Sequence, residues 1–184
     1  MKKLLLGLIA AALLPIAHAA QYAVTPDRSA LTFTYKQMGV PVEGRFRKYS
    51  ARIDFDPAKP AAAKAVIDVD LAGIDTGLPE ADEEVKGKDW FDVKNYPQAH
   101  FESTAVKALG GNRYEASGKL TMHGRTQIVT APFTYGPQGN AAQFEGSFTL
   151  KRADYGIGQG EWADFGTVAN EIQIKFRFLA TAGK

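Results

Sequence analysis

The sequence contains no cysteine. Small secreted domains that cannot build a sufficient hydrophobic core depend on disulfides, so this chain must be held together by packing alone. Its 184 residues are enough for one domain with a full core. The absence of cysteine also excludes a thiol nucleophile and a lipid-modified cysteine at the start of a processed chain.

Long apolar runs are equally scarce. The one clear example is residues 4–14, which follow a short positive segment at 1–3 and precede Ala17-His18-Ala19, with alanine at both cleavage-recognition positions. This three-part layout is typical of a secretory signal peptide, and its apolar core is too short to span a bilayer stably. We therefore expect residues 1–19 to be cleaved and 20–184 to form one periplasmic domain with no stable membrane insertion. An uncleaved anchor is the alternative.

An excess of charge of either sign is also missing. The chain carries 22 basic and 20 acidic side chains, and removal of Lys2 and Lys3 with the signal peptide makes these numbers equal. A neutral surface with both signs interspersed has no electrostatic footprint for nucleic acid. We therefore expect neither nucleic acid nor an anionic membrane surface as a partner.

Histidine is rare, and after loss of the signal peptide only His100 and His123 remain. Neither has metal-ligand spacing to another histidine, and the acidic residues near 82–92 are interleaved with lysines, as on a solvated helix face. No Gly-x-Ser-x-Gly nucleophile motif occurs. The sequence therefore predicts no metal, no catalytic residues and no required cofactor.

Regular alternation of apolar and polar residues is the dominant pattern. Leu31, Phe33 and Tyr35 alternate with threonines, and the same period recurs at 67–71, 114–120, 144–150 and 172–178. Period-2 alternation indicates β-strands with one face in a core and one in water. Shorter segments near 42–46, 52–55, 100–106 and 127–133 complete about eight or nine strands.

The segments between these strands carry turn residues, with one exception. Residues 79–88 are rich in helix formers and have opposite charges at i,i+4 spacing. We expect one short helix there, inserted in an all-β antiparallel domain.

Gly156, Gly158 and Gly160 resemble part of a dinucleotide-binding loop, but Glu161 replaces its third glycine and no helix follows. A tightly turned β-loop is expected instead.

About eight antiparallel strands can form a sandwich or a barrel. Aromatic residues occur at inward parity on nearly every strand, and glycines such as Gly118 and Gly146 share that parity. This combination favours a single extended barrel whose interior has both bulk and gaps, wide enough for one slender ligand. The alternative is that the aromatic side chains simply fill a solid core.

Four motifs in register resemble the YceI-like family of polyisoprenoid-binding, lipocalin-like periplasmic proteins. They are Trp90-Phe91-Asp92 with Pro97 and Phe101; residues 118–126, Gly-Lys-Leu-Thr-Met-His-Gly-Arg-Thr; residues 152–158, Arg-Ala-Asp-Tyr-Gly-Ile-Gly; and residues 168–172, Val-Ala-Asn-Glu-Ile, with Gly44-Arg45-Phe46 and Thr76 also in place. The resemblance implies a lipocalin-like barrel with an inserted helix, an apolar tunnel that binds an isoprenoid lipid or quinone, and no established catalysis.

The inward residues of the strands are the expected tunnel lining. They are Phe33, Phe46, Ile67, Val69, Phe101, Tyr114, Leu120, Phe144, Gly146, Phe148, Ile174 and Phe176. A second set could contact the ligand head group or close a tunnel end: Trp90, Asp92, His123, Arg152 and Asp154.

Several roles in the second set stay open. Trp90 stands where the family pattern has Phe or another apolar residue, which could alter the preferred length or head group. His123 either forms a local turn contact or touches a head group. An inward Arg152 needs a partner because an unpaired buried charge is costly. The partner is either Asp154 or Asp92, or a ligand phosphate or quinone carbonyl.

The sequence thus predicts an exported protein that sequesters or transports a polyisoprenoid. Alternatives are a quinone-presenting accessory with a transient membrane cytochrome partner, a binder of fatty acids or amides, and a lipid-modifying enzyme. A homodimer is compatible with the sequence.

Overall fold

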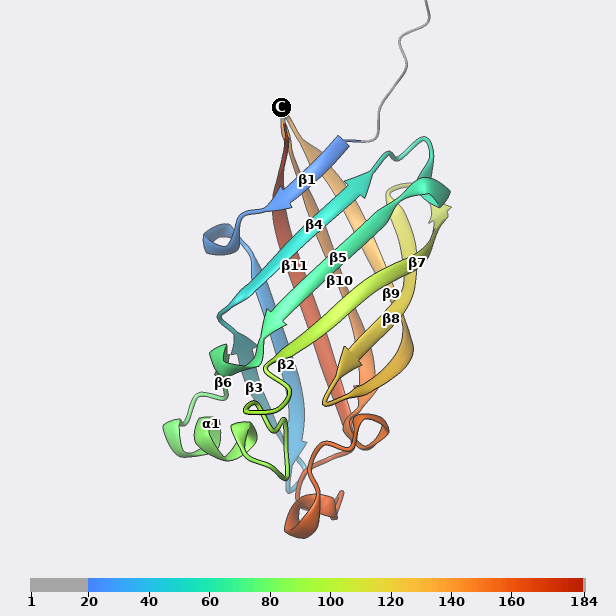
Figure 1. The fold of residues 1–184 in the computed structure, drawn as a ribbon. Coiled ribbons are helices and arrows are strands. Elements are labelled where there is room, and N and C mark those ends of the chain that lie inside the picture. The colour runs from blue at the N-terminus through green and yellow to red at the C-terminus, as the bar shows by residue number, and fades with distance from the viewer. Residues whose placement is uncertain (1–19, 184) are drawn as a thin grey trace, which may run out of the picture.

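The computed structural model describes residues 20–183 (Figure 1). The predicted signal peptide at 1–19 lies outside the described residues, as does Lys184. The strands are β1 (Ala20–Val24), β2 (Ala30–Gln37), β3 (Val40–Phe46), β4 (Tyr49–Phe55), β5 (Lys64–Asp70), β6 (Ile74–Asp75), β7 (Gln98–Gly110), β8 (Arg113–Met122), β9 (Arg125–Gln138), β10 (Ala141–Lys151) and β11 (Glu171–Ala182). The helix α1 spans Pro79–Lys86, and short 3-10 turns are η1 (Pro26–Arg28), η2 (Pro60–Ala62), η3 (Leu71–Gly73), η4 (Arg152–Tyr155) and η5 (Gly160–Ala163).

These strands close into a barrel. The order is β1-β4-β5-β7-β8-β9-β10-β11, and β1 pairs with both β4 and β11. β2 continues β1 and pairs with another part of β11, while β3 and β6 continue β4 and β5 in the same way. Counted as continuous strands, the eleven pieces form the predicted eight-strand antiparallel barrel with one inserted helix. That fold prediction is confirmed, and the sandwich is excluded.

The inward positions of β8 show why the alternating pattern forms this wall. Tyr114, Leu120 and Met122 are buried, whereas Arg113 and Lys119 are exposed. Such a strand buries one face against the interior and leaves the other in water. β8 pairs with both β7 and β9 along its length, which fixes this face inward.

Two strands were not predicted, and the helix is shorter than expected. β1 has five residues and β6 only two, too few to show a period. α1 ends at Lys86 instead of Lys88, because the backbone of Gly87 turns to an extended conformation. Asp82 fastens this helix to the barrel by accepting hydrogen bonds from the backbone N–H and hydroxyl of Thr76, at 2.6 and 2.7 Å.

The turn between β8 and β9 consists of His123 and Gly124, both with positive φ, at 50° and 70°. Two successive residues of this kind make the tight hairpin turn whose twist matches that of paired strands. His123 is therefore fixed at the hairpin tip by the backbone.

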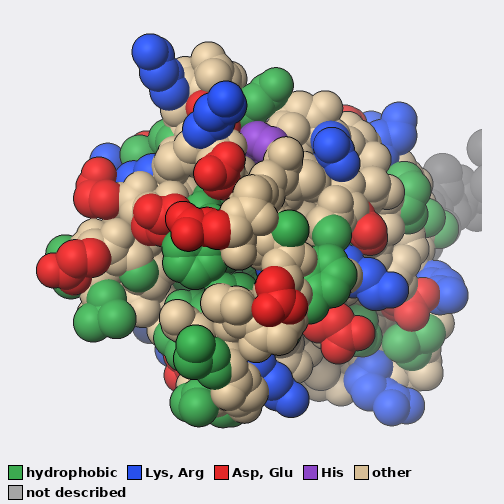
Figure 2. All heavy atoms as spheres, turned by 90° about the horizontal axis from the view of Figure 1, so that it is seen from below, with side chains coloured by type: hydrophobic (Ala, Val, Ile, Leu, Met, Phe, Trp, Pro, Cys, Tyr) green, Lys and Arg blue, Asp and Glu red, His purple; other side chains and the backbone are tan. Residues whose placement is uncertain are grey.

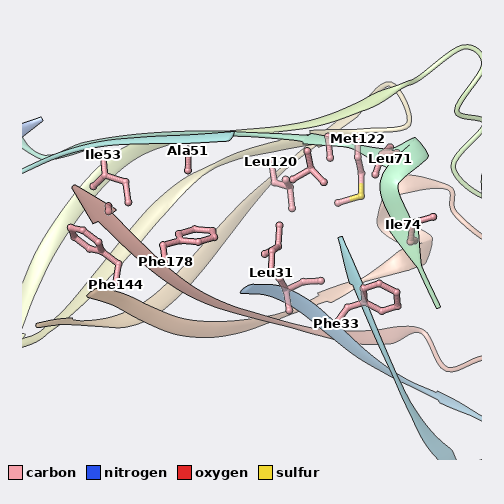
Figure 3. Close-up of a cluster of buried hydrophobic side chains, with 14 of the residues drawn as sticks. Leu31, Phe33, Ala51, Ile53, Leu71, Ile74, Leu120, Met122, Phe144 and Phe178 are labelled. Carbon is pink, nitrogen blue, oxygen red and sulfur yellow. The ribbon is translucent and has the colours of Figure 1, made fainter. Parts of the chain in front are cut away.

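One end of the barrel is filled by aromatic side chains. The ring of Phe55 lies 5.0 Å from that of Tyr114, 4.8 Å from Tyr135 and 5.6 Å from Phe144, between ring centroids. Phe144 also meets Tyr22 at 5.5 Å. Figure 3 shows Phe144, Phe178 and Ile53 gathered on this side of the interior. Each such aromatic pair contributes roughly 0.5–1.5 kcal/mol beyond its buried area, so these rings stabilise the aromatic end.

The opposite end carries α1, η3, η4 and η5 (Figure 1); we call it the helical end. Here Asp75 of β6 accepts hydrogen bonds from Arg45 and Arg47, at 2.7 and 2.6 Å. These bonds join the end of β3 and the residue that follows it to the segment that leads into α1.

Candidate functional site

The barrel interior contains a cavity of about 270 Å³. Its wall is almost entirely apolar and is formed by inward side chains of the strands together with residues of α1, η4 and η5. Ten of the predicted lining residues border it: Phe33, Phe46, Ile67, Val69, Phe101, Leu120, Phe144, Phe148, Ile174 and Phe176. The interior is therefore not the solid core that the sequence left as an alternative.

Two predicted lining residues do not border the cavity. Tyr114 is 5% exposed and belongs to the aromatic end, where its ring stacks on Phe133 at 5.5 Å. The space beside Gly146 is taken by the carbonyl oxygen of Pro132 and the ring of Phe176. The prediction was wrong for both residues. Glycine at position 146 permits a close approach of neighbouring groups and leaves no gap for a ligand.

The sequence missed the lining contributed by irregular segments. α1 adds Ala81 and Val85, whose i,i+4 spacing was the available signal. η5 adds Trp162, and the following loop adds Val168. No periodicity marks these last two residues, so sequence reasoning could not place them.

Few polar side chains border the cavity, and they lie near its ends. Among the described residues they include Gln37, Lys64, Thr76 and Glu84. Burial also raises the pKa of the Tyr35 phenol, which lies on the same wall. A ligand inside the barrel therefore meets hydrocarbon along most of its length.

Arg152 closes the helical end. The side chain is 2% exposed, and all five of its N–H groups donate to backbone carbonyl oxygens. The acceptors and distances are Ala169 at 3.2 Å, Ile157 at 2.9 Å, Gly158 at 2.9 Å, Trp162 at 2.7 Å and Val168 at 2.8 Å. Five donors are all that a guanidinium has, so none is left for a ligand.

The expected partners of Arg152 were therefore wrong. Neither Asp154 nor Asp92 pairs with it in the described part of the chain, and carbonyl oxygens replace the carboxylate. Desolvation lowers the pKa of the guanidinium from its ordinary value. Its Cζ atom lies 5.4 Å from the ring centroid of Trp90 and 5.1 Å from that of Phe165. Cation–π attraction to these rings offsets part of the cost of burying the charge.

Trp90 lies against the cavity, as its position among the candidate head-group contacts suggested. It is 8% exposed, and its ring centroid is 5.5 Å from that of Trp162. Its indole nitrogen is buried and has no hydrogen-bond partner among residues 20–183. The large ring thus acts chiefly as an apolar plug at the helical end.

The other three head-group candidates do not border the cavity. The Nδ1 atom of His123 lies 3.0 Å from the carbonyl oxygen of Tyr155, outside the lining. Asp92 accepts a hydrogen bond from the amide of Asn95 at 2.8 Å. Asp154 is exposed. His123 and Asp92 instead shape turns, where each has positive φ.

Acidic side chains gather on the outer surface of the helical end beside hydrophobic ones, as Figure 2 shows from below. α1 contributes Glu80, Glu83 and Glu84 to this surface. Within residues 20–183, no three or more potential ligand side chains come together as a metal site would require. None of the helices in that same range has the length and apolar character to span a bilayer.

Comparison with known proteins agrees with this geometry. The profile of the YceI-like domain matches residues 22–180. The chain belongs to the YceI-like family. A UPF0312 protein of Vibrio cholerae is 32% identical over 169 residues, which cover 85% of this chain and 89% of the relative. A UPF0312 protein of Pseudomonas putida is 34% identical over 140 residues, covering 73% and 72%.

Solved structures of this YceI-like fold extend the comparison. BcnA of Burkholderia cenocepacia is 45% identical, with a TM-score of 0.84 and coverage of 86% of this chain and 99% of BcnA. A polyisoprenoid-binding domain from Saccharophagus degradans is 15% identical, with a TM-score of 0.72 and coverage of 90% and 99%. At that identity the second likeness concerns the fold alone.

Proposed function

We propose that this YceI-like protein is exported and that it sequesters or carries a polyisoprenoid, either an isoprenoid quinone or a polyprenyl lipid, inside its barrel. The observation that carries the proposal is the apolar cavity bounded by residues such as Phe101, Phe148 and Phe176. A hydrocarbon chain gains about 0.8 kcal/mol for each methylene removed from water. A wall of this kind suits a ligand recognised by its length and girth.

The placement of Arg152 and His123 favours binding over catalysis by these two side chains. The N–H groups of Arg152 are all engaged with carbonyl oxygens, and His123 lies outside the lining. Proton transfer to a bound molecule needs a group within hydrogen-bond reach of it. We therefore propose a carrier that requires no cofactor and whose bound lipid is its cargo.

The choice of an isoprenoid rests on the family resemblance and on the apolar lining of the cavity. The Saccharophagus domain of the same fold is described as polyisoprenoid-binding, and an isoprenoid chain would be in contact with hydrocarbon along this wall. The proposed periplasmic location rests on the N-terminal pattern at residues 1–19. There the protein would shield a water-insoluble lipid during passage between membranes.

The test is organic extraction of the protein purified from its native host, followed by mass spectrometry of the bound material. The expected result is one isoprenoid in near-stoichiometric amount. Recovery of a fatty acid or amide would retain the lipid-binding role and overturn the isoprenoid assignment. An empty protein that also fails to take up added polyprenols would overturn the proposed function.

A further inference from the structure

The hydrogen-bonded wall of the barrel is interrupted between β9 and β10. β9 has fourteen residues, but its ladder to β10 covers only residues 133–138, which pair with 141–146. Residues 125–132 of β9 still pair with β8, and residues 147–151 of β10 still pair with β11. β9 is thus paired with β8, and β10 with β11, while the edges of β9 and β10 that face each other have no ladder between them.

Pro132 and Gly146 mark the point where the ladder stops. The last registered pair is Gly146 with Phe133, and the next residue of β9 is Pro132. Its carbonyl oxygen lies against Gly146, and a residue's N–H and C=O face the same neighbouring strand. Proline has no N–H to donate, so the next rung toward β10 cannot form in the usual way.

At the helical end, β9 and the β8–β9 turn are joined to η4, which directly follows β10. The side-chain amide of Gln127 donates to the carbonyl oxygen of Asp154 at 3.0 Å. The ring of His123 contacts the carbonyl oxygen of Tyr155 at the same distance. We call the bounded interruption, residues 128–132 of β9 and 147–151 of β10, the β9–β10 slot.

The inner side of the slot is the cavity wall. Val129 and Ala131 of β9 and Phe148 and Leu150 of β10 all border the cavity. On the outer side, Ile128, the fourth residue of β9, is 65% exposed. The slot therefore connects an apolar outer residue with an apolar interior.

Both ends of the barrel are held by contacts of a kind that the slot lacks. Aromatic rings around Phe55 pack the aromatic end. At the helical end, five hydrogen bonds from Arg152 hold the loop that follows β10. Local opening favours segments with few internal hydrogen bonds, and unpaired strand edges are such segments.

We propose that a flexible apolar chain enters and leaves the cavity sideways, through the β9–β10 slot. This inference rests on the proposed function, since it concerns how the proposed ligand is loaded. Passage requires the facing edges of β9 and β10 to move apart, while the pairing of β9 with β8 and that of β10 with β11 stay intact. Neither the aromatic end nor the Arg152 network has to open.

The test is to cross-link β9 to β10 across the slot. The chain has no native cysteine, so Thr130→Cys with Thr149→Cys places one pair across the slot, and a thiol-cleavable bismaleimide links it. The matched control is Thr134→Cys with Glu145→Cys, across a registered pair of the same two strands. Thr130→Cys treated with a monofunctional maleimide controls for added bulk.

Loading of dansyl-labelled farnesol is followed by its emission in stopped flow. The slot-linked protein should load at no more than roughly one tenth of the rate of the unmodified protein. Reductive cleavage of the linker should restore that rate. The two controls should load like the unmodified protein. A slot-linked protein that loads at the control rate would overturn the lateral route while leaving binding intact. An unmodified protein that takes up no probe would overturn the proposed function itself.

Discussion

Trp162 of η5 donates its indole N–H to Oε1 of Glu84 on α1, at 2.8 Å, across 78 positions of the sequence. Both residues border the cavity. The bond therefore joins two segments that cover the helical end and that share no strand pairing. It holds η5 against α1 beside the cavity.

Replacing Trp162 with Phe keeps an aromatic ring and removes the donor. Because the bond is exposed, we expect the free energy of unfolding to fall by only about 0.5–1.5 kcal/mol. Amide hydrogen exchange should nevertheless become faster in η5 and α1. The control is Glu83→Gln, which breaks the exposed pair with Lys86 within α1 and should leave η5 unchanged. Unchanged exchange in η5 of Trp162→Phe would show that the bond does not hold this segment.

Replacing Arg152 with Met keeps a long side chain and removes every donor. Five carbonyl oxygens would then lose their partner, and each buried unsatisfied group costs about 1–3 kcal/mol. Allowing for relaxation, we expect a loss of at least about 3 kcal/mol in urea unfolding. Arg177→Met, on the exposed face of β11, serves as the control and should change stability little. Equal midpoints for the two variants would contradict the role assigned to Arg152.

Asp75 makes the stability of the barrel depend on acid pH. Hydrogen bonds from Arg47 and then Arg45 lower the pKa of this carboxyl from 3.8 to about 2. Because the folded-state pKa is below the unfolded value, the stabilisation is complete above about pH 4 and is lost as pH falls toward about 2. Asp75→Asn should therefore lose less stability than the wild type across this window.

Urea midpoints at pH 7, 4 and 2 check this expectation. Asp154→Asn is the matched control, because Asp154 is exposed and in contact with neither arginine. It should retain the full wild-type loss between pH 4 and pH 2. If Asp75→Asn shows the same loss as the wild type, the arginine pair does not govern acid sensitivity.

The strands and the barrel could be predicted from the sequence because a period-2 pattern is local. Leu120 and Phe148 follow from parity alone, and so does their position on the cavity wall. Gly146 has the same parity, yet its surroundings are set by Pro132 and Phe176 from other strands. Parity gives the face of a residue and says nothing of how close the neighbouring groups approach.

The helical end was less predictable because its partners are distant or belong to the backbone. The five acceptors of Arg152 are carbonyl oxygens, which any sequence supplies, so a search for an acidic partner could not find them. Trp162 lies in the short turn η5 and Val168 in the loop after it, and neither segment has a periodicity. The interruption between β9 and β10 has one local signal, Pro132, but its position relative to β10 depends on the register.

Ala116 offers a way to shorten the cavity without disturbing the core. It borders the cavity from β8 and is only partly buried, so a larger side chain can occupy open space instead of overpacking its neighbours. Ala116→Phe should therefore stay folded and lower the longest polyprenol that binds. Excluding two methylenes of the chain would weaken binding roughly tenfold.

Lys119→Phe adds the same ring to the exposed face of the same strand and should leave the length limit unchanged. Titration of both variants with a polyprenol length series measures the effect. A folded Ala116→Phe variant with the wild-type limit would mean that the ligand does not occupy this part of the barrel.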